Sequence, residues 1–265
     1  MTDQPIDFQK LAEVLVPTAI EAGKKIMEIY AQDFEVVFKD DTSPVTVADE
    51  AAEKIILADL VPLTPDIPVV AEESAAAGNI PDVDNRFWLV DPLDGTKEFI
   101  KKGSDFTVNI ALVENRLPVF GIVYAPALNK LYLAKSADEA LIMDVDNNGA
   151  TSNITPIRVR DVPASGIVGV ASKSHRDEAT NEFLDRYGIS DTTSVGSSLK
   201  FCLVASAEAD IYPRFGPTME WDTGAGHAVL RAAGGEVVNP DGTPFLYGKP
   251  DFRNGAFIAN GKVNL

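Results

Sequence analysis

The pattern of apolar residues changes halfway along the chain, and this change constrains the fold more than any single motif. Residues 8–30 carry apolar side chains at helical spacing, with Pro17 expected to kink or restart the helix. Residues 49–60 are rich in Ala, Glu, Lys and Leu, which predicts a second helix. Short apolar runs follow, and turn residues such as 114–116 join them closely enough for hairpins. The first half therefore predicts two helices followed by hairpin-linked strands, an α+β arrangement.

The second half follows a different order. After a polar stretch at residues 144–156, strands such as 167–170 alternate with helices such as 222–233. This alternation indicates an α/β layer. We therefore predict an α/β protein with two packed subdomains, residues 1–155 and residues 156–265.

Composition restricts the partners and the cellular setting. The 265 residues include 23 Lys and Arg against 40 Asp and Glu, a net charge of −17, which argues against a broad nucleic-acid surface. No apolar run approaches the ~18 residues that a membrane span needs, and the N-terminus shows no signal pattern. Cys202 is the single cysteine. We expect a cytoplasmic protein with no transmembrane segment, and the sequence leaves a monomer or a homodimer open.

The most informative motif, Asp91-Pro92-Leu93-Asp94-Gly95-Thr96, directly follows an apolar strand at residues 86–90. Pro92 fixes one backbone dihedral and Gly95 permits a strained turn, so two carboxylates and the Leu93 carbonyl can face one point. Oxygen ligands of this kind suit hard divalent cations such as Mg²⁺. The plain alternative is a type I turn with an aspartate at its start.

Other acidic residues could complete such a site. Glu72 and Glu73 follow a second short strand, although an exposed acidic loop is the simpler interpretation. Asp222 lies at the start of a predicted helix, where an aspartate ordinarily serves as an N-cap. Two carboxylates ~4 Å apart repel by ~4 kcal/mol at an effective dielectric of 20. A convergent set would therefore stay protonated or spread apart unless a divalent cation neutralised it, which favours a cation. His175, His227 and Cys202 are too few for a His/Cys zinc site, which leaves Mg²⁺ or Mn²⁺.

Positive charge is available from three segments at element ends in the second half, residues 172–176, 196–200 and 212–214. Each segment alone is typical of an ordinary exposed surface, but together the three segments could face one cleft. His227 and Cys202 lie among apolar residues and are expected in the core. The sequence has no phosphate loop of P-loop NTPases, no serine-hydrolase elbow and no dinucleotide-binding glycine motif.

Taken together, the segments resemble the inositol monophosphatase superfamily, whose motifs appear here in order at residues 43–49 (SPVTVAD), 72–74 (EES), 91–96 (DPLDGT) and 221–226 (WDTGAG). Within it, residues 91–101, 196–205 and 212–218 resemble the CysQ-type 3′(2′),5′-bisphosphate nucleotidases. The resemblance implies a layered αβαβα sugar-phosphatase fold. It also implies a Mg²⁺-dependent, lithium-sensitive phosphatase of sulfur metabolism that converts adenosine 3′,5′-bisphosphate to AMP by means of a metal-activated water. Two or three Mg²⁺ ions, with Mn²⁺ as a substitute, and peripheral attachment to the inner membrane are further implications.

The same resemblance assigns roles to individual residues. The expected metal ligands are Glu72, Asp91, Asp94, Asp222 and the Leu93 carbonyl. Asp49 and Thr96 would orient the attacking water, with Glu72 assisting. The expected substrate-binding residues are Glu72, Leu93, Asp94, Gly95, Thr96, His175, Ser197, Lys200, Arg214 and Asp222. Among them, Gly95 and Thr96 would offer backbone N–H groups to the scissile phosphate, and His175, Ser197, Lys200 and Arg214 would hold the rest of the nucleotide.

Two alternatives remain. The same chemistry could serve an inositol or sugar monophosphate, although a basic cluster has no evident role with a single phosphate. The chain could also be a non-catalytic module that binds ions or anions, although such modules usually lack at least one ligand and every expected carboxylate is present here.

Overall fold

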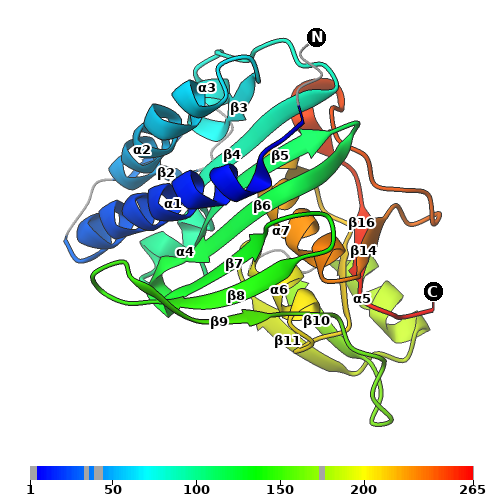
Figure 1. Cartoon of the computed structure of the whole chain (residues 1–265). Helices are drawn as coiled ribbons and strands as arrows, with labels where there is room; N and C mark the ends of the chain where they lie inside the picture. The colour runs from blue at the N-terminus through cyan, green and yellow to red at the C-terminus, as the bar shows by residue number, and fades with distance from the viewer. Residues whose placement is uncertain (1–4, 33–35, 39–43, 173–176, 265) are drawn as a thin grey trace.

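Helices and sheets alternate in five layers. The computed structural model of the chain describes residues 5–32, 36–38, 44–172 and 177–264. Helices α1 (Phe8–Tyr30) and α2 (Val47–Leu63) cover one face of a seven-stranded sheet, and α6 (Leu199–Ala205) and α7 (Glu220–Ala232) separate it from a five-stranded sheet (Figure 1). Helix α5 (Glu178–Arg186) packs on the outer face of the second sheet. The prediction of an α/β fold with αβαβα layers is confirmed.

The seven-stranded sheet is built mainly from consecutive hairpins. Its strands, in spatial order, are β3 (Val69–Ala71), β4 (Arg86–Asp94), β5 (Thr107–Glu114), β6 (Leu117–Ala125), β7 (Lys130–Ala134), β8 (Ala140–Val145) and β9 (Thr151–Pro156). Among these seven described strands, β3 and β4 pair in parallel and the other neighbouring strands pair antiparallel. Because side chains alternate along a strand, Trp88 and Val90 of β4 pack against α1 and α2, while Phe87 and Leu89 pack on the side of α7.

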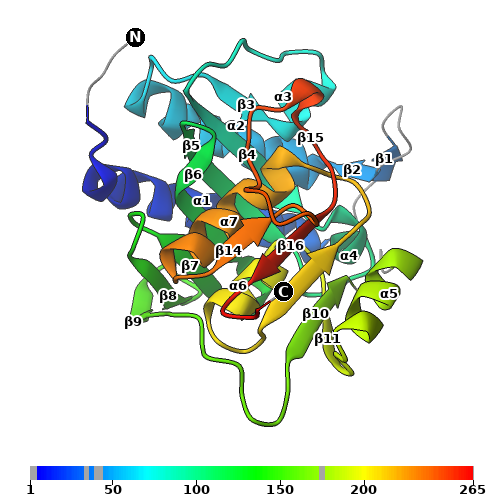
Figure 2. The same cartoon turned by 90° about the vertical axis from the view of Figure 1, so that its right-hand side faces the viewer.

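The five-stranded sheet belongs entirely to the second half of the chain. Its order is β11 (Asp191–Val195), β10 (Val168–Ser172), β12 (Ile211–Arg214), β16 (Phe257–Asn260) and β14 (Glu236–Val238). Side chains of α6 and α7 share one apolar core with both sheets, and Figure 2 shows α7 running between them. A common core therefore joins the two halves of the chain, and the division into subdomains at residues 155 and 156 stays a prediction.

Short elements complete the structure. They are the antiparallel pair β1 (Val36–Phe38) and β2 (Pro44–Thr46), helices α3 (Glu72–Ala76) and α4 (Thr96–Ile100), the pair β13 (Thr218–Met219) and β15 (Arg253–Asn254), and two 3₁₀ turns at Pro126–Leu128 and Pro250–Phe252. Both α3 and α4 begin where a strand of the first sheet ends, and they carry the predicted acidic and threonine residues.

Two details go beyond the sequence expectations. The polar stretch at residues 144–156, next to the predicted subdomain boundary, forms the end of β8, a turn, and the edge strand β9. Helix α1 continues through Pro17 as one element. Pro17 lies on the exposed side of α1, where water can satisfy the carbonyl left without an N–H partner.

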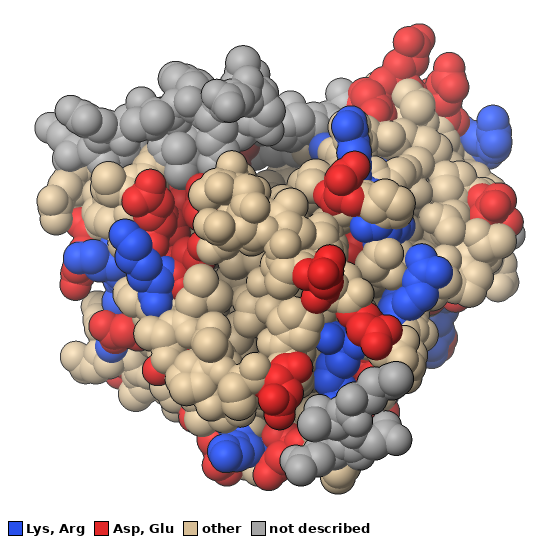
Figure 3. Space-filling model, turned by 90° about the horizontal axis from the view of Figure 1, so that it is seen from above, with Lys and Arg blue, Asp and Glu red and all other residues tan. Residues whose placement is uncertain are grey.

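The surface carries both signs of charge. In the view from above, lysines and arginines are interspersed with aspartates and glutamates rather than gathered in one basic field (Figure 3). Within the described residues, none of the helices combines the length and the apolar character that crossing a membrane requires.

Candidate active site

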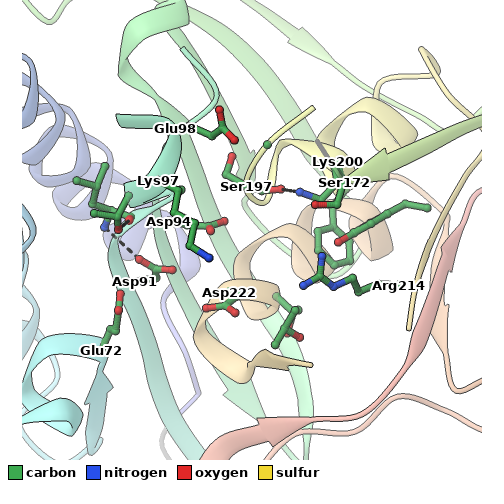
Figure 4. A pocket seen from close by; sticks show the side chains of 18 of the residues that line it. Glu72, Asp91, Asp94, Lys97, Glu98, Ser172, Ser197, Lys200, Arg214 and Asp222 are labelled. Carbon is green, nitrogen blue, oxygen red and sulfur yellow. Dashed lines mark hydrogen bonds between the residues drawn. The ribbon is translucent and has the colours of Figure 1, made fainter. Parts of the chain in front are cut away.

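The first two carboxylates of the site come from the ends of paired strands. Strands β3 and β4 run parallel with Ala71 opposite Val90, and each strand is followed or continued by an acidic residue, Glu72 and Asp91. Parallel strands end at the same sheet edge, so these two side chains lie close together (Figure 4). Asp91 is buried, and its carboxyl group shares a hydrogen bond with that of Glu72.

The motif Asp91–Thr96 forms a tight bend at the end of β4. The Asp91 carboxylate accepts a hydrogen bond from the Leu93 N–H at 3.0 Å, and the ladder with β5 is irregular between Asp91 and Asp94. Gly95 has φ 95°, and a Cβ at this position would approach the Asp105 carbonyl oxygen to 2.8 Å. Glycine is therefore required here, and the bend turns both aspartates toward one cavity.

Asp222 brings a carboxylate from the second half of the chain. It is the third residue of α7 rather than its cap residue, which is Met219. Its Oδ2 accepts a hydrogen bond from the Met219 N–H at 2.8 Å. The expected capping function is thus present, and the same side chain also faces the cavity (Figure 4).

A cavity of about 270 Å³ lies where these elements meet. Ten of the twelve predicted site residues line it: Glu72, Asp91, Leu93, Asp94, Gly95, Thr96, Ser197, Lys200, Arg214 and Asp222. Asp49 instead lies behind Thr96, whose hydroxyl is 3.2 Å from Asp49 Oδ1. His175 lies outside the described residues.

Burial and mutual repulsion act on the aspartates. Burial, together with the charges of Glu72, Asp94 and Asp222, raises the pKa of Asp91 well above its ordinary value. Burial and the Asp94 charge raise the pKa of Asp222 in the same way. Burial raises the pKa of Asp94 to about 6, although the Lys200 charge and the Ser198 N–H oppose it. Carboxylates in this state favour a bound cation, which would restore their ionised form.

The donor set fits Mg²⁺ or Mn²⁺ in chemistry. Carboxylate oxygens and a backbone carbonyl are hard ligands, and no histidine or cysteine lines the cavity among the described residues. Within the same described residues, no three acidic, histidine or cysteine side chains close around a single point. The carboxylates of Glu72, Asp91, Asp94 and Asp222 instead line one shared cavity.

The other side of the cavity is basic. Lys200 of α6 is almost fully buried, and burial lowers its pKa to about 8 against the opposing influence of Asp94. Its ammonium donates to the Ser197 carbonyl at 2.5 Å. Arg214, at the end of β12, donates to the carbonyls of Gly216 and Pro217 at 3.2 Å each. Both cations therefore stand pre-oriented across the cavity from Glu72 and Asp91 (Figure 4).

Several lining residues were not singled out as site residues from the sequence. Those with polar groups are Lys97, Glu98, Ser172, Tyr212, Thr218 and Thr223. Lys97 and Glu98 directly follow the Asp91–Thr96 motif, so their place in the chain was a usable signal. Thr218 reaches the cavity from β13 and Thr223 from α7, and the sequence alone does not reveal how these two elements pack.

Comparison with known proteins identifies the scaffold. The family model described as "Inositol monophosphatase family" matches residues 7–263. The chain belongs to the inositol monophosphatase family. Proteins of this family are metal-dependent phosphatases. The chain is 48% identical over 231 residues to the 3′(2′),5′-bisphosphate nucleotidase CysQ of Escherichia coli K12, covering 86% of this chain and 90% of that protein. It is 39% identical over 258 residues to CysQ of Buchnera aphidicola, covering 96% and 94%.

Solved structures agree with this family assignment. The crystal structure of CysQ from Bacteroides thetaiotaomicron superposes with a TM-score of 0.81 at 39% identity, covering 98% of this chain and all of that one. An inositol monophosphatase from Thermotoga maritima gives a TM-score of 0.77 at 24% identity, which shows the shared fold alone.

Proposed function

We propose that this protein is a Mg²⁺-dependent 3′(2′),5′-bisphosphate nucleotidase that hydrolyses adenosine 3′,5′-bisphosphate to AMP and phosphate. The observation that supports this choice of substrate is the pair of buried cations, Lys200 and Arg214, which face the same cavity as the carboxylates. A monophosphate placed at the carboxylates would bring no second phosphate to Lys200 and Arg214. The similarity to proteins named 3′(2′),5′-bisphosphate nucleotidase supports the same choice.

Glu72, Asp91, Asp94, Asp222 and the Leu93 carbonyl would hold two or three ions. Bound Mg²⁺ supplies Lewis acidity for the water and the phosphate, and neutralises the carboxylates. The reaction replaces the bond between the ribose oxygen and phosphorus with a bond to water oxygen, so phosphate and a ribose hydroxyl are the products.

Thr96 and Asp49 are arranged to orient that water. Asp49 Oδ2 already accepts from the N–H and the hydroxyl of Thr46, both at 2.8 Å, so its Oδ1 is left for the Thr96 hydroxyl. A Thr96 hydroxyl that donates to Asp49 keeps its lone pairs for a hydrogen of a water in the cavity. Burial raises the pKa of Asp49 to about 6, close enough to neutral pH for the carboxylate to receive a proton through Thr96.

Lys200 and Arg214 would bind the phosphate that does not react. Arginine suits this task because its guanidinium can donate two parallel hydrogen bonds to one phosphate. Arg214→Ala should raise KM for adenosine 3′,5′-bisphosphate by about 10- to 100-fold, since a hydrogen bond between charged groups contributes about 1.5–3 kcal/mol. Arg158→Ala, which removes an exposed arginine outside the cavity, is the matched control.

The test is phosphate release from adenosine 3′,5′-bisphosphate and from an inositol monophosphate, with and without Mg²⁺ and with added Li⁺. The proposal expects a higher kcat/KM for the bisphosphate, dependence on Mg²⁺ and inhibition by Li⁺. A preference for the inositol ester, or an unchanged KM in the Arg214 variant, would contradict the substrate. No release from either ester at saturating Mg²⁺ would indicate a non-catalytic module.

A further inference from the structure

A chain of buried hydrogen bonds runs beneath the cavity from one half of the molecule to the other. It consists of Thr107 and Asn109 of β5, Ser198 at the start of α6, and Asp94 at the end of β4. Thr107, Asn109 and Ser198 are each at most 1% exposed, and none of them lines the cavity. These three polar residues therefore lie behind the cavity wall, and their burial needs an explanation other than lining the cavity.

The direction of donation is the same at each step of this series of hydrogen bonds. The Ser198 hydroxyl donates its only proton to Asn109 Oδ1 at 2.7 Å. The Thr107 hydroxyl, 2.9 Å from Ser198 Oγ, must then be the donor in that pair. Because Asn109 Oδ1 is occupied, its Nδ2 is the group directed at Asp94 Oδ2, at 3.4 Å. The order of donation is Thr107 to Ser198 to Asn109 to Asp94.

Ser198 also reaches Asp94 directly. Its backbone N–H donates to Asp94 Oδ2 at 2.6 Å. Both donors therefore act on Oδ2, and within the described parts of the chain no hydrogen-bond donor is found at Oδ1. Two donors on one oxygen fix the rotation of the carboxylate, which leaves Oδ1 turned toward the cavity.

The strand register explains how these residues meet. In the β4–β5 ladder Asn109 lies opposite Asp91 and Thr107 lies opposite Asp94, and the ladder is irregular between the two pairs. The irregularity lets Asn109 reach past its own partner to Asp94. Ser198 comes from the second half of the chain, two residues before Lys200, so the same contact ties α6 to β4.

We propose that Thr107, Asn109 and Ser198 are positioning residues that hold the Asp94 carboxylate in the orientation needed to bind a divalent cation. The cation-binding part of this inference does not depend on the substrate, whereas its effect on turnover rests on the proposed function. Removing the Ser198 hydroxyl breaks the chain in the middle and frees Asn109 to turn, so the carboxylate loses one of its two donors.

The test is calorimetric titration of Mn²⁺ into the metal-free protein. Ser198→Ala should weaken Mn²⁺ binding by about 3- to 12-fold, the equivalent of one lost hydrogen bond. Thr107→Val keeps the side-chain shape but removes the first donor and should weaken binding about 3-fold. Thr107→Ser keeps the hydroxyl but loses a methyl group and should stay within about 2-fold of the unmodified protein. Thr18→Val removes a buried hydroxyl from α1, far from the site, and should also stay within about 2-fold.

The comparison of Thr107→Val with Thr107→Ser tests the proposal even if Ser198→Ala does not fold. Equal Mn²⁺ affinities in Thr107→Val and Thr107→Ser would overturn the proposal, because packing rather than hydrogen bonding would then explain the burial. In turnover assays the Mg²⁺ concentration for half-maximal phosphate release should rise by the same factor as the Mn²⁺ dissociation constant. Absence of turnover in the unmodified protein would count against the proposed function alone, since the Mn²⁺ titrations do not depend on it.

Discussion

Glu53 offers a sharp test of how the short helix α3, which begins at Glu72, is held in place. This glutamate of α2 is 6% exposed and accepts three hydrogen bonds from the first turn of α3. The donors are the Glu73 N–H at 2.8 Å, the Ser74 N–H at 3.0 Å and the Ser74 hydroxyl at 2.6 Å. In Glu53→Gln one oxygen becomes an NH₂ group, which must face one of these donors.

The cost follows from those contacts. One buried N–H left without an acceptor costs about 1–3 kcal/mol, and the remaining hydrogen bonds lose the strength that a charged acceptor gives. We expect Glu53→Gln to lower the free energy of unfolding by about 2–4 kcal/mol. Glu50→Gln on the same helix is the control, because its exposed contact with Lys54 at 3.9 Å should contribute less than about 0.5 kcal/mol.

The measurement is urea unfolding followed by tryptophan fluorescence, with equal m-values required for the comparison. Phosphate release provides a second readout, because a less firmly held α3 should displace Glu72 and lower kcat. A difference between Glu53→Gln and Glu50→Gln below about 0.5 kcal/mol would refute the reasoning.

Three further predictions concern the site and the core. Asp91→Asn should abolish Mg²⁺-dependent phosphate release because an N–H donor replaces an expected ligand oxygen, and retained turnover would remove Asp91 from the site. Mg²⁺ at 100 times its dissociation constant should stabilise the fold by about 2.7 kcal/mol, seen as a higher Tm that EDTA reverses; an unchanged Tm would argue against a bound ion. Burial lowers the pKa of His227 to about 3 from its ordinary 6.5, so only the unfolded chain takes up this proton between those values and stability falls as the pH drops below 6.5. In His227→Gln that decline should be smaller by up to about 1.4 kcal/mol per pH unit, measured by urea unfolding at pH 7 and pH 5, and identical declines would contradict a neutral buried His227.

The sequence predicts those parts of the fold whose side chains alternate against a core. β4 and β5 are recognisable because nearly every residue is buried and each strand contains an apolar run of four residues, 87–90 and 110–113. The edge strand β9 is exposed along its whole length, so its residues show no apolar pattern and resemble a linker. The four-residue strand β16 is buried but too short to be distinguished from the loops beside it.

The candidate site also has one part that the sequence predicts and another that it does not. The bend at Asp91–Thr96 is local, and its aspartates and glycine can be recognised without knowledge of the fold. The meeting of Asp222 and Lys200 with that bend depends on how α7 and α6 pack between the sheets, so only the resemblance to a family could supply it. The sequence did not indicate Asn109 and Ser198 as part of the site, because single polar residues in apolar surroundings form no recognisable motif. A buried amide in a core strand is nevertheless a signal of a specific hydrogen-bond partner.

The most direct test of the account is anomalous diffraction from crystals of the protein grown with Mn²⁺ and AMP. The account predicts Mn²⁺ peaks bounded by Glu72, Asp91, Asp94 and Asp222, with the AMP phosphate near Lys200 and Arg214. Ordered AMP in the cavity with no Mn²⁺ peak beside these carboxylates would contradict it.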